Sequence, residues 1–127
     1  MALAQITDAE EDKAYREAYD KIVETLKMMK DKGIFIVAGT DLGGAFNLHR
    51  ELELYVDQLG FTNGEILKRA TYDMAQYLGQ DDLGTLEPGK LADFFLVPGN
   101  PVEDIKAIKT IEMVSKGGTF YYPTEVY

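Results

Sequence analysis

Positions 34–38 hold five consecutive apolar residues (Ile-Phe-Ile-Val-Ala), and this run constrains the fold more than any other feature of the sequence. The run is short, rich in β-branched side chains and free of polar interruption. It is typical of a strand that is buried on both faces, as the strands of a parallel sheet are. Helical patterns precede and follow the run, and this order of helix, buried strand and helix indicates an α/β fold.

A long amphipathic helix is predicted before the strand. Thr7 and Glu10 have the spacing of a capping box, with Thr7 as the N-cap. We expect the apolar residues that follow at helical spacing to form one buried stripe. They are Tyr15, Ala18, Tyr19, Ile22, Leu26 and Met29.

Two further amphipathic helices are predicted after the strand. The first covers residues 48–59. The second begins with a capping box of Thr62 and Glu65 and ends before Gly79. Glu51 and Glu53 lie close together in the first of these helices but fall on different sides of it. We expect both glutamates to belong to a solvated face.

The character of the sequence changes near residue 80, where a turn-rich stretch begins. We therefore divide the chain into an α/β part, residues 1–80, and a small β-rich part, residues 81–127. A hairpin turn is expected at residues 116–118. The strands predicted in the β-rich part are residues 92–97, 110–115 and 119–122.

The composition is acidic and contains no cysteine. Thirteen Lys and Arg against 22 Asp and Glu give a formal net charge of −9. Such a surface repels phosphate backbones and anionic lipids, so we expect neither a nucleic acid nor a membrane partner. The lack of cysteine excludes disulfides and thiolate metal sites. No apolar run approaches the roughly 20 residues of a membrane helix, and the first residues lack the layout of a signal peptide. We expect a soluble chain, of the cytoplasm rather than the periplasm.

Asp41 is the most suggestive candidate for chemistry, because it comes just past the predicted strand. Folds of the α/β class place their active sites at the C-terminal ends of parallel strands. The same carboxylate could equally cap a turn or the next helix, and position alone does not decide between the two. The glycine-rich loop around Asp41, which contains Gly43 and Gly44, could also cradle a phosphate. That reading fails because the Lys-Ser/Thr ending of a P-loop is absent and the loop carries an acid.

His49 is the only histidine in the chain. A lone histidine at the start of an amphipathic helix is more often a structural or surface residue than a ligand. Catalytic zinc usually takes three protein ligands, and His49 with Asp41 would supply two at most. A hydrolytic triad has no better support, because the only serine, Ser115, lies inside a predicted strand.

Several stretches occur in an order that is characteristic of one enzyme family. They are residues 36–41 (IVAGTD), 48–54 (LHRELEL), 70–75, 86–93 (LEPGKLAD), 99–105 and 114–118. The first resembles the eighth barrel strand of the amidohydrolase superfamily, in its imidazolonepropionase-like and prolidase-like branch. The others resemble, in turn, the helices that follow that strand and the return to the small β-sandwich domain of those enzymes. The resemblance covers nearly the whole chain.

The resemblance implies the last strand and helices of a TIM-type (β/α)8 barrel, followed by C-terminal strands of a small β-sandwich domain. It also implies one or two divalent metals, often zinc, and a metal-activated water that attacks an amide or related C–N bond. The aspartate that matches Asp41 is there a metal ligand and a general base. The substrate pocket of the family is bordered by the region that matches His49, Gly43 and Gly44.

The departures from the family's pattern point to a C-terminal fragment. The His-x-His pair, the bridging Lys or Glu and the further histidines of the family are absent, so we expect the chain alone to be inactive and to bind no metal stoichiometrically. For the full-length parent we expect a divalent metal, with zinc favoured, and a small amide, dipeptide or cyclic amide as substrate. The alternative is a non-catalytic binding or assembly module. It would be a homo-oligomer in which residues 34–38 pair with their copy, because unpaired strand edges favour association.

Overall fold

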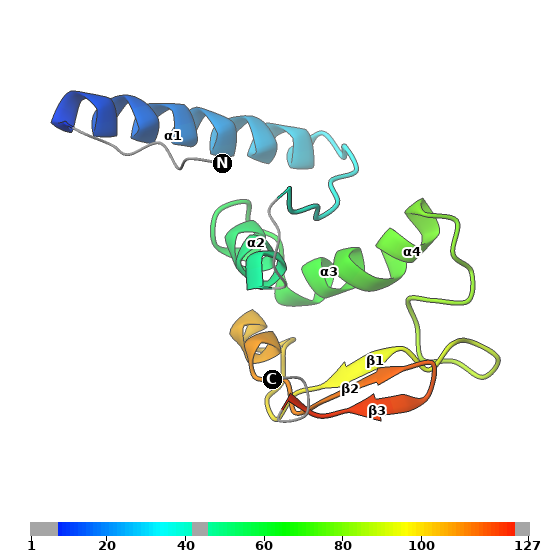
Figure 1. Ribbon diagram of the computed structural model, residues 1–127. Helices are drawn as coiled ribbons and strands as arrows, with labels where there is room; N and C mark the ends of the chain where they lie inside the picture. The colour runs from blue at the N-terminus through cyan, green and yellow to red at the C-terminus, as the bar shows by residue number, and fades with distance from the viewer. Residues whose placement is uncertain (1–7, 42–45, 124–127) are drawn as a thin grey trace. The chain divides into compact units, whose positions relative to one another are not determined.

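The computed structural model describes residues 8–41 and 46–123. They fall into two compact units, one that ends at Ile36 and one that begins at Val37. Figure 1 shows the helices and strands of the two units. No described helix combines the length and the apolar character that crossing a membrane requires.

The first unit contains the helix α1 (Ala9–Asp31), which confirms the long helix predicted there. Its N-cap is Asp8, whose carboxylate accepts hydrogen bonds from the backbone N–H groups of Glu10 at 3.0 Å and Glu11 at 2.8 Å. The prediction of Thr7 as the N-cap is therefore wrong by one residue, and Thr7 itself lies outside the described residues. Aspartate caps a helix as well as threonine does, and its charge also complements the positive end of the helix dipole.

The apolar stripe of α1 is not buried, contrary to the prediction. The helix contains no buried residue, and Tyr15 is 48% and Ile22 59% exposed. An amphipathic helix buries its stripe only against a second element. The described part of the first unit contains no such element. The periodicity thus identified the apolar face of α1 correctly. It could not show whether this chain contains an element that covers that face.

Residues 34–41 form neither a helix nor a strand, so the structure shows no strand at residues 34–38. A strand requires hydrogen bonds to the backbone of a neighbouring strand. The strands within the described ranges pair only with one another. Ala38 is nevertheless buried. The segment therefore keeps the apolar character of a strand without the ladder that would define one.

The described part of the second unit contains several helical elements and a small sheet. The helical elements are α2 (Phe46–Asp57), α3 (Asn63–Lys68), the π-helix η1 (Arg69–Asp73), α4 (Met74–Tyr77) and the 3-10 helix η2 (Ile105–Lys109). The strands are β1 (Phe94–Leu96), β2 (Met113–Lys116) and β3 (Thr119–Tyr121). These elements confirm the helices and the strands predicted for residues 48–122, with bounds that differ by a few residues.

The capping box predicted at Thr62 is present. The Glu65 carboxylate accepts from the Thr62 backbone N–H at 2.8 Å, and the Thr62 hydroxyl accepts from the Glu65 backbone N–H at 3.2 Å. The helix that follows was predicted as one regular element. It instead passes through the π-helical turn η1 before it ends in α4. A single wider turn of this kind leaves no mark on apolar periodicity.

The three strands form an antiparallel sheet in the order β1-β2-β3. Phe95 pairs with Val114, and Val114 pairs with Tyr121. The hairpin predicted at residues 116–118 joins β2 to β3. The chain thus combines helices with a small three-stranded sheet, as predicted.

The core of the second unit lies where α2, α3 and η2 meet. The helix α2 contacts both α3 and η2, and η2 appears beside α2 in Figure 1, in orange. The buried apolar side chains are Leu52, Leu59, Phe61, Ile66, Ala75, Ile105 and Ile108.

A buried carboxylate, that of Glu53, lies in this core. Glu53 is 1% exposed, so the expectation that it belongs to a solvated face is wrong. Its carboxylate forms ion pairs with Arg50, one turn earlier in α2, and with Lys109 at the end of η2. The two cations are themselves partly exposed. They therefore remain hydrated while they neutralise the buried charge, which would otherwise be costly to bury.

Removing the charge of Glu53 should destabilise the chain in a pH-dependent way. The hydrogen bond from Lys109 lowers the pKa of Glu53 below its ordinary value of 4.5, against the opposing effect of burial. A lowered pKa contributes stability that is present above pH 4.5 and is lost as the pH falls through the lowered value. We expect Glu53→Gln to cost about 1–3 kcal/mol at pH 7. The cost should shrink as the pH falls below 4.5.

Urea denaturation at several pH values measures this difference. Glu112→Gln, which changes an exposed glutamate of the same unit, should shift the free energy of unfolding by less than about 0.5 kcal/mol. An equal loss for both variants, or a loss for Glu53→Gln that does not change with pH, would contradict the assignment.

A methyl group at Gly84 should be more costly than one at Gly89. Both glycines have a positive φ, +89° and +92°, so alanine is strained by about 1–3 kcal/mol at either position. A Cβ at Gly84 would lie 2.9 Å from both the Ala75 Cβ and the Tyr72 Cα, whereas a Cβ at Gly89 would meet nothing within 4 Å. We expect Gly84→Ala to lose about 1–3 kcal/mol more than Gly89→Ala. Equal urea midpoints would show that the tight contact at Gly84 does not exist.

Candidate functional site

Asp41 lies at the end of the irregular segment 34–41, and the residue is exposed. Its carboxylate is therefore open to solvent and to any group that approaches from outside. Gly43 and Gly44, which were predicted to border a substrate pocket with His49, lie outside the described residues. His49 is half-buried in the first half of α2.

The backbone just before Asp41 is held by a side chain of α2. The Glu51 Oε1 atom accepts a hydrogen bond from the Gly39 backbone N–H at 3.0 Å. The same oxygen accepts a hydrogen bond from the Tyr55 hydroxyl at 2.7 Å. The Tyr55 oxygen also lies 3.5 Å from the carbonyl oxygen of Val37. Because the hydroxyl has one hydrogen, the shorter contact assigns that hydrogen to Glu51.

The surroundings of Tyr55 keep its hydroxyl protonated. Burial raises the pKa of Tyr55 well above its ordinary value of 10.0, and the hydrogen bond and charge of Glu51 raise it further. The ring of Tyr55 also packs against that of Phe61, with 6.1 Å between the ring centroids. Tyr55 is therefore a fixed hydrogen-bond donor at neutral pH.

Sequence reasoning missed this arrangement and assigned Glu51 to a solvated face. Glu51 is half-buried, and both of its partners come from the segment around Asp41 or from its own helix. A signal was present, because Glu51 and Tyr55 are spaced i and i+4 and must meet on one helix face. The spacing could not reveal Gly39 as the second donor.

The described residues do not form a complete metal site. Across residues 8–41 and 46–123, no group of three or more His, Cys, Asp or Glu side chains is placed to hold a metal ion. Asp41 can offer one carboxylate and His49 one imidazole, whereas a catalytic zinc site usually takes three protein ligands. Any metal centre that uses Asp41 must therefore draw further ligands from outside the described residues.

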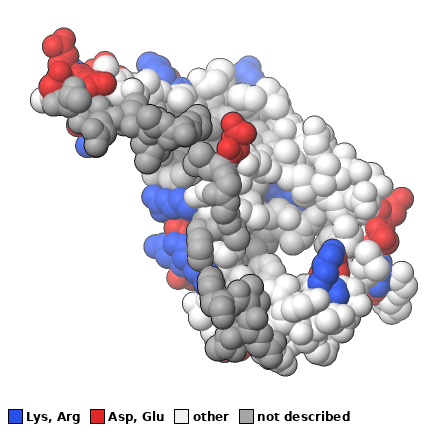
Figure 2. All heavy atoms as spheres, in the orientation of Figure 1, with Lys and Arg blue, Asp and Glu red and all other residues white. Residues whose placement is uncertain are grey.

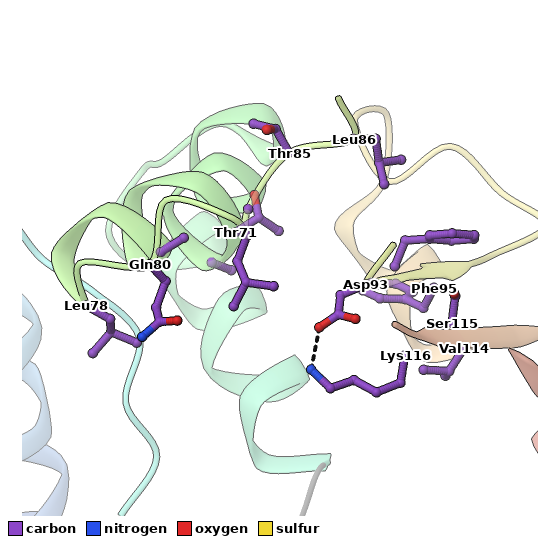
Figure 3. A pocket seen from close by; sticks show the side chains of 15 residues that line it. Thr71, Leu78, Gln80, Thr85, Leu86, Asp93, Phe95, Val114, Ser115 and Lys116 are labelled. Atoms are coloured by element: carbon purple, nitrogen blue, oxygen red, sulfur yellow. Dashed lines mark hydrogen bonds and ion pairs between the residues drawn. The ribbon is translucent and has the colours of Figure 1, made fainter. Parts of the chain in front are cut away.

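A separate open groove of about 600 Å³ lies between the η1–α4 helical stretch and the sheet. In Figure 3, Thr71 and Leu78 lie on the helical side, and Phe95 and Val114 lie on the strand side. Most of its lining is apolar, and none of its lining residues precedes residue 70. Asp41 and His49 therefore do not belong to this groove.

The acid of the groove is already engaged. The carboxylate of Asp93 pairs with Lys116, the dashed contact in Figure 3, and accepts the Gly117 backbone N–H at 2.6 Å. The hydrogen bond from Lys116, with that of Gly117, lowers the pKa of Asp93. Asp93 therefore stays ionised and ties the start of β1 to the hairpin, and the groove offers no free acid or base for chemistry.

The surface over α4 is largely uncharged. Figure 2 shows little blue or red there, and the exposed apolar side chains of this region include Tyr77 at 67% and Leu78 at 61%. Large exposed apolar patches mark surfaces that bind another chain or domain. With the groove beneath it, this region has the character of a packing surface rather than of a reaction site.

Comparisons with known proteins identify the family of this chain. The model of the Amidohydrolase family matches residues 12–120. No curated protein matches the chain. A crystal structure of a Xaa-Pro dipeptidase with bound methionine in its active site is 34% identical, with a TM-score of 0.72, over 80% of this chain and 25% of that one. The ochratoxinase of A. niger is 27% identical, with a TM-score of 0.77, over 91% of this chain and 28% of its own.

A third structure is that of a prolidase complexed with N-methylphosphonate-L-proline. It is 29% identical, with a TM-score of 0.68, over 79% of this chain and 26% of that one. The chain thus spans only 25% to 28% of the length of these structures. The family match itself covers most of the chain and includes the segment that ends in Asp41. The chain therefore belongs to the amidohydrolase family.

Proposed function

We propose that this chain is the C-terminal part of a metal-dependent hydrolase of C–N bonds and contributes Asp41 to an active site that it does not complete. The observation that carries the proposal is the family match, which runs through Asp41. The exposed carboxylate of Asp41 fits a residue that meets partners from elsewhere. The short span relative to the solved enzymes also supports a partial site.

The proposal includes the architecture of the family. Residues 1–80 would be the last strand and helices of a TIM-type barrel, and residues 81–127 would be part of a small β-sandwich domain. The run at residues 34–38 would become a paired strand once neighbouring barrel strands lie beside it. Its uninterrupted apolar sequence supports this, because such runs belong to strands covered on both faces.

The chemistry proposed for Asp41 is that of a metal ligand and general base. A divalent metal, with zinc favoured, would supply Lewis acidity and a water of lowered pKa. The Asp41 carboxylate would accept the proton of the attacking water as its oxygen bonds to the amide carbon. The same carboxylate would then return that proton to the departing nitrogen. An exposed carboxylate at the end of a positioned segment is suited to both transfers.

The substrate class proposed for the whole enzyme is a small amide, and dipeptides are the candidates that we favour. Two of the similar structures are by their names a Xaa-Pro dipeptidase and a prolidase. N-acyl amino acids and cyclic amides belong to the same reaction class, since all present a carbonyl carbon bonded to nitrogen. His49 would border the substrate pocket, together with Gly43 and Gly44.

A second candidate is a non-catalytic assembly module. It is favoured by the exposed apolar stripe of α1 and by the lack of a strand partner for residues 34–38 among the described residues. Both features would be covered in a homo-oligomer.

Replacing Asp41 with Asn in the whole enzyme should abolish turnover. The amide keeps the size of the side chain but cannot accept the proton, so we expect kcat to fall by about 10²–10⁴-fold with an unchanged melting temperature. Asp57→Asn, a change at an exposed position at the end of α2, should leave kcat near that of the wild type. Near-normal turnover by the Asp41→Asn enzyme would refute the role assigned to Asp41.

Calorimetric titration of the metal-stripped 127-residue chain with zinc tests the fragment proposal. The fragment proposal predicts no stoichiometric binding, because Asp41 and His49 supply too few ligands. Binding at a defined ratio that is lost in Asp41→Asn would instead mean that Asp41 and His49 from several copies build one site, and it would contradict the fragment proposal.

A further inference from the structure

We propose that Glu51 is a positioning residue, which holds the segment 37–39 so that Asp41 faces its reaction partners in one fixed geometry. The inference rests on the proposed function of Asp41. It concerns a different residue, on a different element, whose carboxylate contacts Gly39 and Tyr55.

The Glu51 carboxylate holds the backbone at Gly39 through a hydrogen bond. The backbone N–H of Gly39 belongs to a segment with no ladder among the described strands. Gly39 is exposed, and its backbone N–H donates to the Glu51 carboxylate at 3.0 Å. A charged acceptor makes a stronger bond than a neutral carbonyl does. The segment is thus anchored to α2 by a side chain.

The anchor lies close enough to Asp41 to control its position. Gly39 and Asp41 are two residues apart, so their Cα atoms are separated by at most about 7 Å. A shift of the Gly39 backbone is therefore passed on to the Asp41 carboxylate. Misplacing a reacting group by about 1 Å can cost about 10²-fold in rate.

Tyr55 makes the anchor rigid. Its hydroxyl donates to the same Oε1 atom at 2.7 Å, from a position one helical turn after Glu51. Two donors on one oxygen, one from the backbone and one from the half-buried Tyr55, restrict the rotamer of Glu51. The carboxylate therefore stays where the Gly39 N–H requires it.

The space around Gly39 indicates that its N–H, rather than its small size, serves this arrangement. A Cβ at Gly39 would meet no atom of the described residues within 4 Å, and the φ of Gly39 lies outside the range that favours glycine. Gly39→Ala retains the N–H and should leave the anchor intact. This variant is the matched control for the loss of the Glu51 acceptor.

The first test measures kinetics of the whole enzyme with Glu51→Leu, Glu51→Gln and Tyr55→Phe. We expect Glu51→Leu to lower kcat by about tenfold to a hundredfold, since the acceptor is lost. KM should change by less than about twofold. Glu51→Gln keeps an acceptor oxygen and should restore most of the rate, and Tyr55→Phe should fall between the two. Gly39→Ala should resemble the wild type.

A merely structural role for Glu51 would give a different pattern. It would lower the melting temperature and the active fraction, with Leu tolerated at least as well as Gln in a half-buried position. Wild-type kcat for Glu51→Leu, or no rescue by Glu51→Gln, overturns the inference.

The second test needs no activity and uses the 127-residue chain. Hydrogen exchange of the Gly39 amide, followed by NMR, should be slowed in the wild type and in Glu51→Gln, and fast in Glu51→Leu. Fast exchange in the wild type would show that the hydrogen bond does not exist and would overturn the inference. Full activity of Asp41→Asn would remove the proposed function while leaving the exchange result standing, so the two failures are distinguishable.

Discussion

The packing of the described part of the second unit depends on a buried charge, the carboxylate of Glu53. This side chain is 1% exposed and meets Lys109, which lies more than fifty residues further along the chain. Breaking a buried ion pair by removing one partner leaves a desolvated charge, which is among the most costly defects a fold can have. The pair therefore fixes η2 against α2, and with η2 it fixes the approach of the chain to β2. The apolar core around Ile105 and Ile108 closes over the same contact.

The helix α2 serves two neighbours through two glutamates. Glu53 reaches η2, whereas Glu51 reaches the backbone at Gly39. Residues two apart on a helix point to different sides, so one short helix can hold the Asp41 segment on one side and the C-terminal part on another. The position of Asp41 is thereby tied to the core of the unit through α2. This arrangement restrains the backbone two residues before the exposed carboxylate of Asp41.

Several apolar surfaces of the described residues are not covered by another element. The stripe of α1 is exposed, residues 34–41 have no strand partner among the described residues, and an apolar groove lies open beside the sheet. Each feature is what an element shows when the layer that covers it is missing, because apolar faces are stable only against one another. The similar solved structures are about three times as long as this chain, which agrees with that reading.

The sequence by itself determined the helices, the capping box of Thr62, the three strands with their hairpin, and the family of the chain. These features depend on residues close together in the chain or on an ordered set of motifs, so a linear reading can recover them. Only the tertiary structure decided that Glu53 is buried, that Glu51 anchors Gly39, that Asp8 rather than Thr7 caps α1, and that the run at 34–38 forms no strand. Burial and pairing depend on which distant segments are present to make contact. An amphipathic or apolar pattern shows which side chains are stable only when buried. Which segment covers them is determined by the rest of the fold.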